Sequence, residues 1–377
     1  MQSRNCRLYN FLYAFLLFNS IRLNAQSTLF TLEDPSVTNV LFNNGLNEDT
    51  QINALTYQYL YNGGGVAAGD INNDGLCDLF FTGNMVQDKL YLNTGSLHFE
   101  DITGAAGITE PEGWSTGVTM ADVNADGWLD IYVCRSGPYS TNKRQNLLYV
   151  NNHNNTFTES AAQFGLNDSS FSTQAAFFDS DADGDLDMFL LNHAVTQLQG
   201  YNTGDMRNRR DPYAGNKLFR NDNGYFTDIS AEAGINGSPM TFGLGLVISD
   251  FNNDQLPDIY VTNDYQEQDF LYINQGNNQF TEQIEQSFGH TANFSMGCDV
   301  ADINYDGFMD MMAVDMLPES NERQKKLKGG TRFDAYELAT NYGFFYQHMH
   351  NMLQLNNGNS TFSEIAWSAG VAATDWS

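Results

Sequence analysis

Short apolar runs alternate with polar stretches rich in Gly, Asn and Asp along most of the chain. Runs of this length, bounded by turn residues, are typical of β-strands, whereas a helix would need a longer stretch with a period near 3.6. Only residues 334–342 carry a trace of helical periodicity. The pattern therefore predicts a chain built from many short strands joined by turns.

The runs belong to a unit that recurs five times. A segment of small and apolar residues comes first, as in residues 65–69 and 117–121. A second apolar segment follows at residues 79–81, 131–133, 188–191, 259–261 and 311–314. A third, of the Leu-Tyr-x-Asn type, ends at Asn93, Asn151, Asn221, Asn274 and Asn356. A fourth, with an acid two residues later, starts at Phe99, Phe157, Phe226, Phe280 and Phe362.

Four strands per unit, repeated around an axis, make the blades of a β-propeller. An open β-solenoid or a row of small sandwiches is the alternative. Units of about 40 residues with variable insertions favour blades over the much shorter β-helix repeats. We therefore expect an all-β fold, a β-propeller of four-stranded blades.

The connection between the first and second segments of each unit has the pattern Asp-x-[Asp/Asn]-x-Asp-Gly-x-x-Asp. Positions 1, 3, 5 and 9 carry side-chain oxygens in all five copies, which are Asp70, Asn72, Asp74 and Asp78; Asp122, Asn124, Asp126 and Asp130; Asp179, Asp181, Asp183 and Asp187; Asp250, Asn252, Asp254 and Asp258; and Asp302, Asn304, Asp306 and Asp310. Calcium prefers roughly six to eight oxygen ligands in flexible geometry, and magnesium a tight octahedron. Carboxylates this close would repel one another without a cation. The loops therefore predict Ca²⁺ binding, about one ion per loop.

Loop four departs from the pattern, because Gln255 replaces the glycine at position 6 and Pro257 follows. Glycine permits the positive φ that a sharp turn requires. We expect this site to be the weakest of the five, or its loop to turn differently.

The composition agrees with a cation-binding, extracellular protein. The chain has 46 acidic and 17 basic residues and a net charge of −29, which disfavours contact with nucleic acid. Residues 1–25 resemble a secretory signal peptide, with a basic start, an apolar stretch and Ala25 before the cleavage site. No later segment is apolar enough for a membrane span. We therefore expect a secreted or cell-envelope protein, and free, buried thiols at Cys77, Cys134 and Cys298.

The loops, the Leu-Tyr-x-Asn segment and the Phe-x-[Asp/Glu] segment resemble FG-GAP/VCBS repeats, as in the integrin α-subunit propeller. Residues 61–66, 315–319 and 374–377 are similar to a narrower group, secreted bacterial proteins with similarity to cartilage acidic protein. That group usually carries an ASPIC/UnbV domain after the propeller. The resemblance implies a calcium-stabilised propeller used for binding or adhesion, without established catalysis.

The ends of the repeat region suggest an incomplete ring. Trp376 matches the aromatic residue that lies eight positions before the loop in four units. The interpretation is a propeller over residues 64–377, with five blades and the start of a sixth that is truncated. On this interpretation a C-terminal domain of the same chain is missing, and residues 26–63 are an N-terminal segment that supplies a possible ring-closing strand.

The long insertions all fall between the second and third strands, at residues 135–145, 193–215 and 315–350. Strand alternation places them on the face opposite the aspartate loops, where their Arg, Lys and aromatic residues suggest a patch for an acidic or sugar ligand; solvated loops are the alternative. We expect a binding or adhesion module for a glycan, matrix or cell-surface protein, and no enzyme. The alternatives are a calcium-supported polysaccharide-degrading enzyme and a scaffold for the missing domain. His348 and His350 could also ligate a transition metal.

Overall fold

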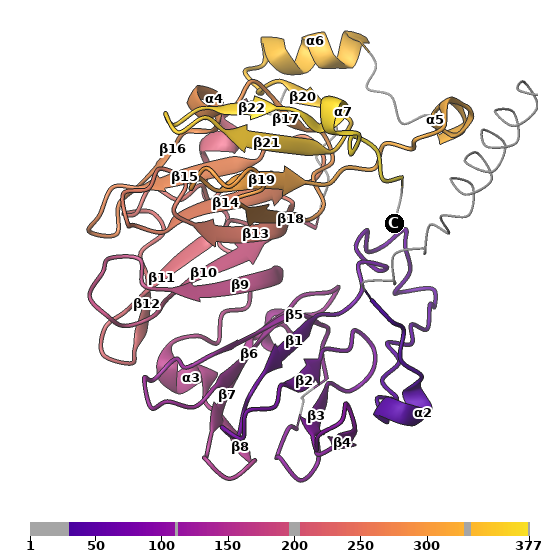
Figure 1. The fold of residues 1–377 in the computed structure, drawn as a ribbon, viewed down its shortest axis with the longest axis vertical. Helices are drawn as coiled ribbons and strands as arrows, with labels where there is room; N and C mark the ends of the chain where they lie inside the picture. Colours follow the sequence, from indigo (N-terminus) through magenta and orange to yellow (C-terminus); the bar gives the residue numbers. More distant parts are fainter. Residues whose placement is uncertain (1–29, 110–111, 196–203, 328–332, 376–377) are drawn as a thin grey trace, which may run out of the picture. The chain divides into compact units, whose positions relative to one another are not determined.

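The computed structural model describes residues 30–109, 112–195, 204–327 and 333–375 (Figure 1). The chain divides into two units, residues 1–39 and residues 40–377. In the first unit a single helical turn, α2 (Pro35–Thr38), follows Asp34, whose side chain accepts a hydrogen bond from the N–H of Ser36. The signal peptide expected at residues 1–25 and the aromatic match at Trp376 lie outside the described residues.

The described part of the second unit contains five four-stranded antiparallel sheets and one two-stranded parallel sheet, β17 (Thr291–Ala292) with β20 (Gln347–His348). The five larger sheets form the repeated structure. Each four-stranded sheet is a blade whose strands, here called A to D, follow one another in chain order. The blades are β1 (Val66–Gly69), β2 (Asp78–Phe81), β3 (Lys89–Asn93) and β4 (Phe99–Asp101); β5 (Ser115–Ala121), β6 (Asp130–Arg135), β7 (Leu147–Asn151) and β8 (Phe157–Glu159); β9 (Ser172–Phe178), β10 (Asp187–Asn192), β11 (Lys217–Asn221) and β12 (Phe226–Asp228); β13 (Gly243–Ser249), β14 (Asp258–Asn263), β15 (Phe270–Asn274) and β16 (Phe280–Glu282); and β18 (Cys298–Ala301), β19 (Asp310–Ala313), β21 (Met352–Asn356) and β22 (Phe362–Glu364).

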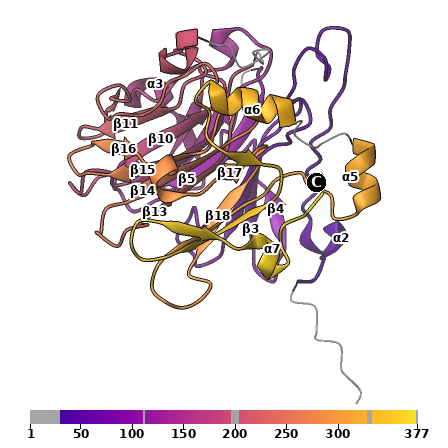
Figure 2. The same ribbon diagram turned by 90° about the horizontal axis from the view of Figure 1, so that it is seen from above.

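Neighbouring blades pack face to face in chain order. Their A strands contact one another, β1 with β5, β5 with β9, β9 with β13 and β13 with β18 (Figure 1), and Figure 2 shows β13 beside β18 from above. This is the arrangement of β-propeller blades, and it confirms the predicted fold class.

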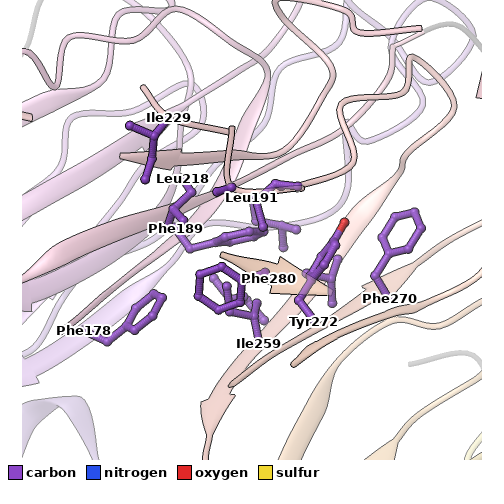
Figure 3. Packing of buried hydrophobic residues seen from close by; sticks show 13 residues of the cluster. Phe178, Phe189, Leu191, Leu218, Ile229, Ile259, Phe270, Tyr272 and Phe280 are labelled. Atoms are coloured by element: carbon purple, nitrogen blue, oxygen red, sulfur yellow. The ribbon is translucent and has the colours of Figure 1, made fainter. Parts of the chain in front are cut away.

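The hydrophobic core consists of layers between adjacent blades. In the layer between blades three and four, Phe178 and Phe189 face Ile259, Tyr272 and Phe280 (Figure 3). Similar clusters join blades one and two, two and three, and four and five. Each blade buries residues on both faces, which explains why strand B of blades two, three and four is buried at every position.

The helices are few and lie outside the blades. The helical trace at residues 334–342 corresponds to α6 (Phe333–Asn341), which confirms that expectation. The insertions also contain η1 (Thr141–Lys143), η2 (Gly204–Asn208) and α5 (Asn321–Leu327). One-turn helices follow strand D in three blades, at α3 (Ala161–Phe164), α4 (Ile284–Ser287) and α7 (Ala366–Ala369). Among the described residues, no helix is long and apolar enough to cross a bilayer.

Residues 40–63 contain turns and bends, and the ring-closing strand suggested for residues 26–63 of a complete propeller stays a prediction. The segment buries Tyr57, Tyr59 and Leu60 in a cluster with Trp114 and Phe242. These three side chains attach the segment to the ends of blades two and four.

All three cysteines in the described residues are free, as expected. Cys134 is buried and Cys298 partly buried, but Cys77 is exposed, so the expectation of burial was wrong for Cys77. Cys77 lies at position 8 of the first aspartate loop, and such loops project into solvent.

Candidate calcium sites

The five aspartate loops occupy the same place in every blade, between strands A and B. Position 1 directly follows strand A in blades one, two, three, four and five, and the aspartate at position 9 is the first residue of strand B. The structure therefore places all the residues of the predicted pattern at equivalent points of five equivalent blades.

A common set of hydrogen bonds shapes each loop. In loop one, Oδ1 and Oδ2 of Asp70 accept the N–H groups of Asp74 (3.1 Å) and Gly75 (2.7 Å). Oδ1 of Asn72 also accepts the N–H of Asp74 (3.1 Å). Oδ1 of Asp74 in turn accepts the N–H of Leu76 (2.8 Å). The backbone thus curls around the side chains at positions 1, 3 and 5, whose oxygens accept its N–H groups.

Position 6 has the positive φ that the sequence predicted for its glycine. The angle is 86° at Gly75, 87° at Gly127, 98° at Gly184 and 87° at Gly307. Gln255 adopts φ 74°, and its N–H binds Oδ2 of Asp250 at 2.8 Å. Loop four therefore turns like the others, so the alternative of a different turn is excluded, and the strain of a side chain at positive φ remains.

Position 4 is a second left-handed position, which sequence reasoning missed. Its φ is close to 60° in all five loops, at Asn73 (60°), Ala125 (57°), Ala182 (62°), Asn253 (60°) and Tyr305 (61°). Asparagine tolerates this region well, but alanine and tyrosine do not. In the sequence, only the asparagines at position 4 of loops one and four indicated a left-handed residue there.

The aspartate at position 9 is buried and already has hydrogen-bond partners. Asp258 accepts the N–H groups of Phe251 (2.9 Å) and Asn274 (2.8 Å), and the other four make equivalent bonds. Burial raises the pKa of Asp258 to about 7 and the pKa values of Asp130 and Asp187 to about 6. A bound cation would favour the ionised form of these groups and reverse that effect of burial.

Loop three is the loop that fits a hard cation most directly. Asp179, Asp181 and Asp187 each offer a carboxylate oxygen, and these oxygens lie within 4.8 Å of one another. Oδ1 of Asp181 is buried without a hydrogen-bond partner among the described residues. In the other loops position 3 is asparagine; in loop one Nδ2 of Asn72 donates to Oδ2 of Asp74 (3.0 Å), so the amide would have to turn its oxygen toward an ion.

The asparagine that ends strand C holds the loops in place, a role that the sequence analysis did not identify. Nδ2 of Asn274 donates to the carbonyl of Pro257 in its own loop (3.1 Å) and to that of Ser180 in the preceding loop (2.8 Å). Asn151 binds Ile71 and Asn356 binds Phe251 in the same way, both at 2.8 Å. Each of these asparagines therefore connects one blade to the loop of the blade before it.

The C–D connections lie beside the aspartate loops, as strand alternation predicted. Nε2 of His153 lies 3.0 Å from Oδ2 of Asp126, and its ring stacks on Trp128. Nδ2 of Asn278, from blade four, donates to Oδ2 of Asp181 in loop three (2.6 Å).

Three arginines of the insertions do not contribute to the open positive patch that was expected. Arg135 and Arg144 are buried, and the guanidinium of Arg144 stacks on Phe171 at 3.7 Å. Arg207 makes two bonds to the buried carboxylate of Glu267, at 3.0 and 2.6 Å. These arginines hold the insertions onto the blades, because buried charge requires a partner.

Part of the patch does line a hollow. Arg209 and Arg210, from the insertion of blade three, border a cavity of about 570 Å³ together with Tyr342, Glu282 and Glu285. Burial raises the pKa of Glu282 to about 7. Oε1 of Glu282 caps the turn after strand D, and the equivalent acid in other blades does the same, as Glu159 and Glu364 show. Glu282 therefore has a structural role common to the blades.

Two stretches of the chain, residues 70–133 and 250–313, match the family of FG-GAP-like repeats. The chain is 29% identical over 208 residues to cartilage acidic protein 1 of Xenopus tropicalis, which covers 54% of this chain and 29% of that protein. The human protein of the same name is 26% identical over 227 residues, 58% of this chain and 31% of its own length. The chain thus spans less than a third of the length of these relatives.

Two solved structures are also similar. A lectin of Agrocybe aegerita that recognises non-reducing terminal N-acetylglucosamine has a TM-score of 0.41 and 15% identity, over 79% of this chain and 64% of that one. The V. cholerae biofilm matrix protein Bap1 has a TM-score of 0.39 and 12% identity, over 79% and 38%. Each matched stretch runs from the aspartate loop of one blade into strand B of the next, from blade one to two and from blade four to five, so the chain contains FG-GAP-like repeats within its β-propeller blades and is similar in sequence to cartilage acidic protein 1.

Proposed function

We propose that this protein is a secreted, calcium-dependent binding module and not an enzyme. The observation that carries the proposal is the single hydrogen-bond pattern shared by five aspartate loops, in which the carboxylate at position 1 accepts the N–H of position 6. Five copies of one arrangement, on one face of consecutive blades, favour a common role over five unrelated acidic turns.

Calcium is the ion that suits these donors. The oxygens are carboxylates, asparagine amides and the carbonyl at position 7, which are the ligands of a hard cation with flexible coordination. Each ion would neutralise carboxylates that otherwise repel, in a chain with a net charge of −29. In this proposal the ions fix the loops, and through the strand-C asparagines they also fix the junctions between blades.

The ligand would bind on the opposite face, at the hollow bordered by Arg209, Arg210 and Tyr342. Arginine donors and an aromatic ring suit a glycan with acidic groups or an acidic segment of a matrix or cell-surface protein. The predicted signal peptide supports a location outside the cytoplasm. The rival interpretation, a polysaccharide-degrading enzyme, would use the acids beside this hollow, but Glu282 already caps a turn.

The test is an array of glycans and matrix proteins probed with the full-length protein, with calcium and with chelator. The proposal expects a ligand that is retained in calcium and lost in chelator. Arg209→Ala combined with Arg210→Ala should abolish its binding, whereas Arg220→Ala, which removes an exposed arginine paired with Asp222, should not. Binding that is unchanged by chelator, or cleavage of an arrayed glycan, would contradict the proposal.

A further inference from the structure

Three of the six histidines in the chain gather at one place, far along the sequence from one another. His290 lies in the connection between blades four and five, and His348 and His350 lie in the insertion of blade five. The parallel pairing of β17 (Thr291–Ala292) with β20 (Gln347–His348) brings the two segments together. The rings of His290 and His348 are 4.7 Å apart, and those of His290 and His350 are 5.8 Å apart.

A carboxylate completes the group. His290, His350 and Glu364, the last residue of β22, each offer one ligand atom, and the three atoms lie within 4.8 Å of one another. Two ligand atoms of one zinc ion are at most about 4 Å apart, since each bond is about 2.0–2.2 Å long. In a tetrahedral site the ligand atoms are about 3.3–3.6 Å apart, so side-chain movements of up to about 1.5 Å would bring all three atoms onto one ion.

The hydrogen bonds around these side chains leave the required lone pairs available. Nδ1 of His350 binds the backbone carbonyl of Asn351 at 2.6 Å, so Nδ1 carries the proton and Nε2 holds a lone pair. Such a carbonyl contact is the usual outer-shell partner of a metal-bound histidine. Nε2 of His290 is buried without a hydrogen-bond partner among the described residues. Oε1 of Glu364 accepts the N–H of Ala366 (2.6 Å), and its other oxygen remains for a ligand.

We propose that His290, His350 and Glu364 form a binding site for a borderline divalent metal ion such as Zn²⁺, separate from the calcium loops. Two imidazoles and one carboxylate are a donor set that zinc prefers and that calcium, which binds oxygen, does not. Three protein ligands leave a fourth position for water or for His348, whose ring stacks on Tyr336 at 5.7 Å. The ion would join the insertion of blade five to strand D and to the connection from blade four.

The experiment is a titration of the full-length protein with Zn²⁺ alone in excess calcium, which keeps the carboxylate loops filled. Co²⁺ then serves as a spectroscopic probe of nitrogen ligation. We expect one equivalent of Zn²⁺, and visible Co²⁺ absorption bands that Zn²⁺ displaces. His290→Ala and His350→Ala should each lower the affinity at least tenfold and remove the bands.

Two further variants separate ligation from folding. Glu364→Gln retains the oxygen that accepts the N–H of Ala366 but loses the carboxylate, so the fold should persist while zinc affinity falls. His98→Ala removes a histidine from blade one and should change nothing. The proposal is overturned if zinc binding survives in folded His290→Ala and Glu364→Gln proteins, if His98→Ala removes it, or if the wild-type protein binds no zinc.

Discussion

At the scale of single residues, the loops show how the chain distributes unfavourable backbone conformations. Each loop has two left-handed positions, and glycine occupies only position 6, in four of the five loops. Position 4 accepts Ala125, Ala182 and Tyr305, each at a cost of about 1–2 kcal/mol. The sequence could predict position 6 because glycine reports positive φ, and it could not predict position 4, where three loops carry no such signal.

Gln255→Gly should stabilise loop four. Relief of strain at φ 74° is worth about 1–2 kcal/mol, and the greater freedom of glycine in the unfolded chain offsets roughly half of it. We expect a gain of about 0.5–1 kcal/mol and tighter calcium binding at this site, as measured by urea unfolding and calorimetric titration.

The reverse substitution is the control. A side chain at Gly307 would meet no neighbour within 4 Å, so Gly307→Gln tests backbone conformation alone. It should destabilise loop five by a similar amount. Weaker calcium binding in Gln255→Gly would show that the glutamine side chain, and not the backbone, matters at this position.

Asp269 should make stability fall as pH rises. Its carboxyl accepts the N–H of Asn263 (2.8 Å) and contacts the hydroxyls of Tyr260 (2.6 Å) and Ser295 (2.8 Å), and burial raises its pKa to about 7. The unfolded group titrates near 3.9. Its contribution is therefore fully present below about pH 4 and is lost as the pH rises to about 7.

Asp269→Asn should remove this dependence and stabilise the protein at about pH 8, by an amount on the order of 3 kcal/mol. Blade two already has an asparagine at the equivalent position. Asn146 donates there to Tyr132 (3.0 Å) and Ser172 (3.1 Å). Urea unfolding at several pH values in excess calcium is the measurement. Asn146→Asp should create a new dependence of the same sign; parallel curves for all three proteins would refute the assignment.

At the scale of elements, the strands and the insertions followed from the sequence, because five copies reinforced one pattern. Elements outside the repeat could not be predicted from the sequence. α3, α4 and α7 are single helical turns, too short to produce a periodicity. The burial of Tyr57 and Tyr59 depends on residues from several blades, which no local pattern reveals. Nothing in the sequence links His290 to Glu364: Glu364 lies opposite Gln354 of β21, whose side chain donates to the carbonyl of His290 (3.2 Å).

The contact between Arg207 and Glu267 should be a main support of the insertions. Glu267 is fully buried, and Arg207 also stacks on Phe344 at 4.5 Å and donates to the carbonyl of Gly343 (2.7 Å). Arg207→Met would leave a buried carboxylate without its partner, which costs about 3–5 kcal/mol. The midpoint of urea unfolding should fall accordingly.

Two further variants distinguish the loss of a buried charge partner from other effects of the substitution. Arg220→Met breaks a pair with Asp222 whose side chains are 38% and 49% exposed, and should cost at most about 1 kcal/mol. The double change Arg207→Met with Glu267→Met should recover much of the loss, because no unpaired charge remains. A double variant as unstable as Arg207→Met would mean that packing, and not charge, dominates.

At the scale of the whole molecule, the proposed ions should control stability. Binding to the native state raises stability by mass action, and extracellular calcium sites bind at about 10⁻⁴–10⁻³ M. The melting temperature of the full-length protein should be many degrees higher in millimolar calcium than in chelator. Magnesium at equal concentration should have a smaller effect, and identical melts in calcium and chelator would contradict the proposal.

The sequence could predict the blades and the placement of their loops, but not how the blades depend on one another. That dependence comes from contacts between blades, such as the bond from Asn274 to the carbonyl of Ser180, 94 residues earlier. The repeated asparagine was visible in the sequence, yet a strand-ending residue has no obvious partner until the preceding loop is placed beside it.

The direction of these asparagine bonds has a consequence for how the protein is made. Asn151 holds loop one, Asn274 holds loop three and Asn356 holds loop four, so in each case a later blade secures an earlier loop. A chain is synthesised from its N-terminus, so the earlier blades exist before the later ones. The backbone carbonyl in each of these loops gains its asparagine partner only after the following blade has been synthesised. Each loop therefore reaches its final structure later than the rest of its own blade.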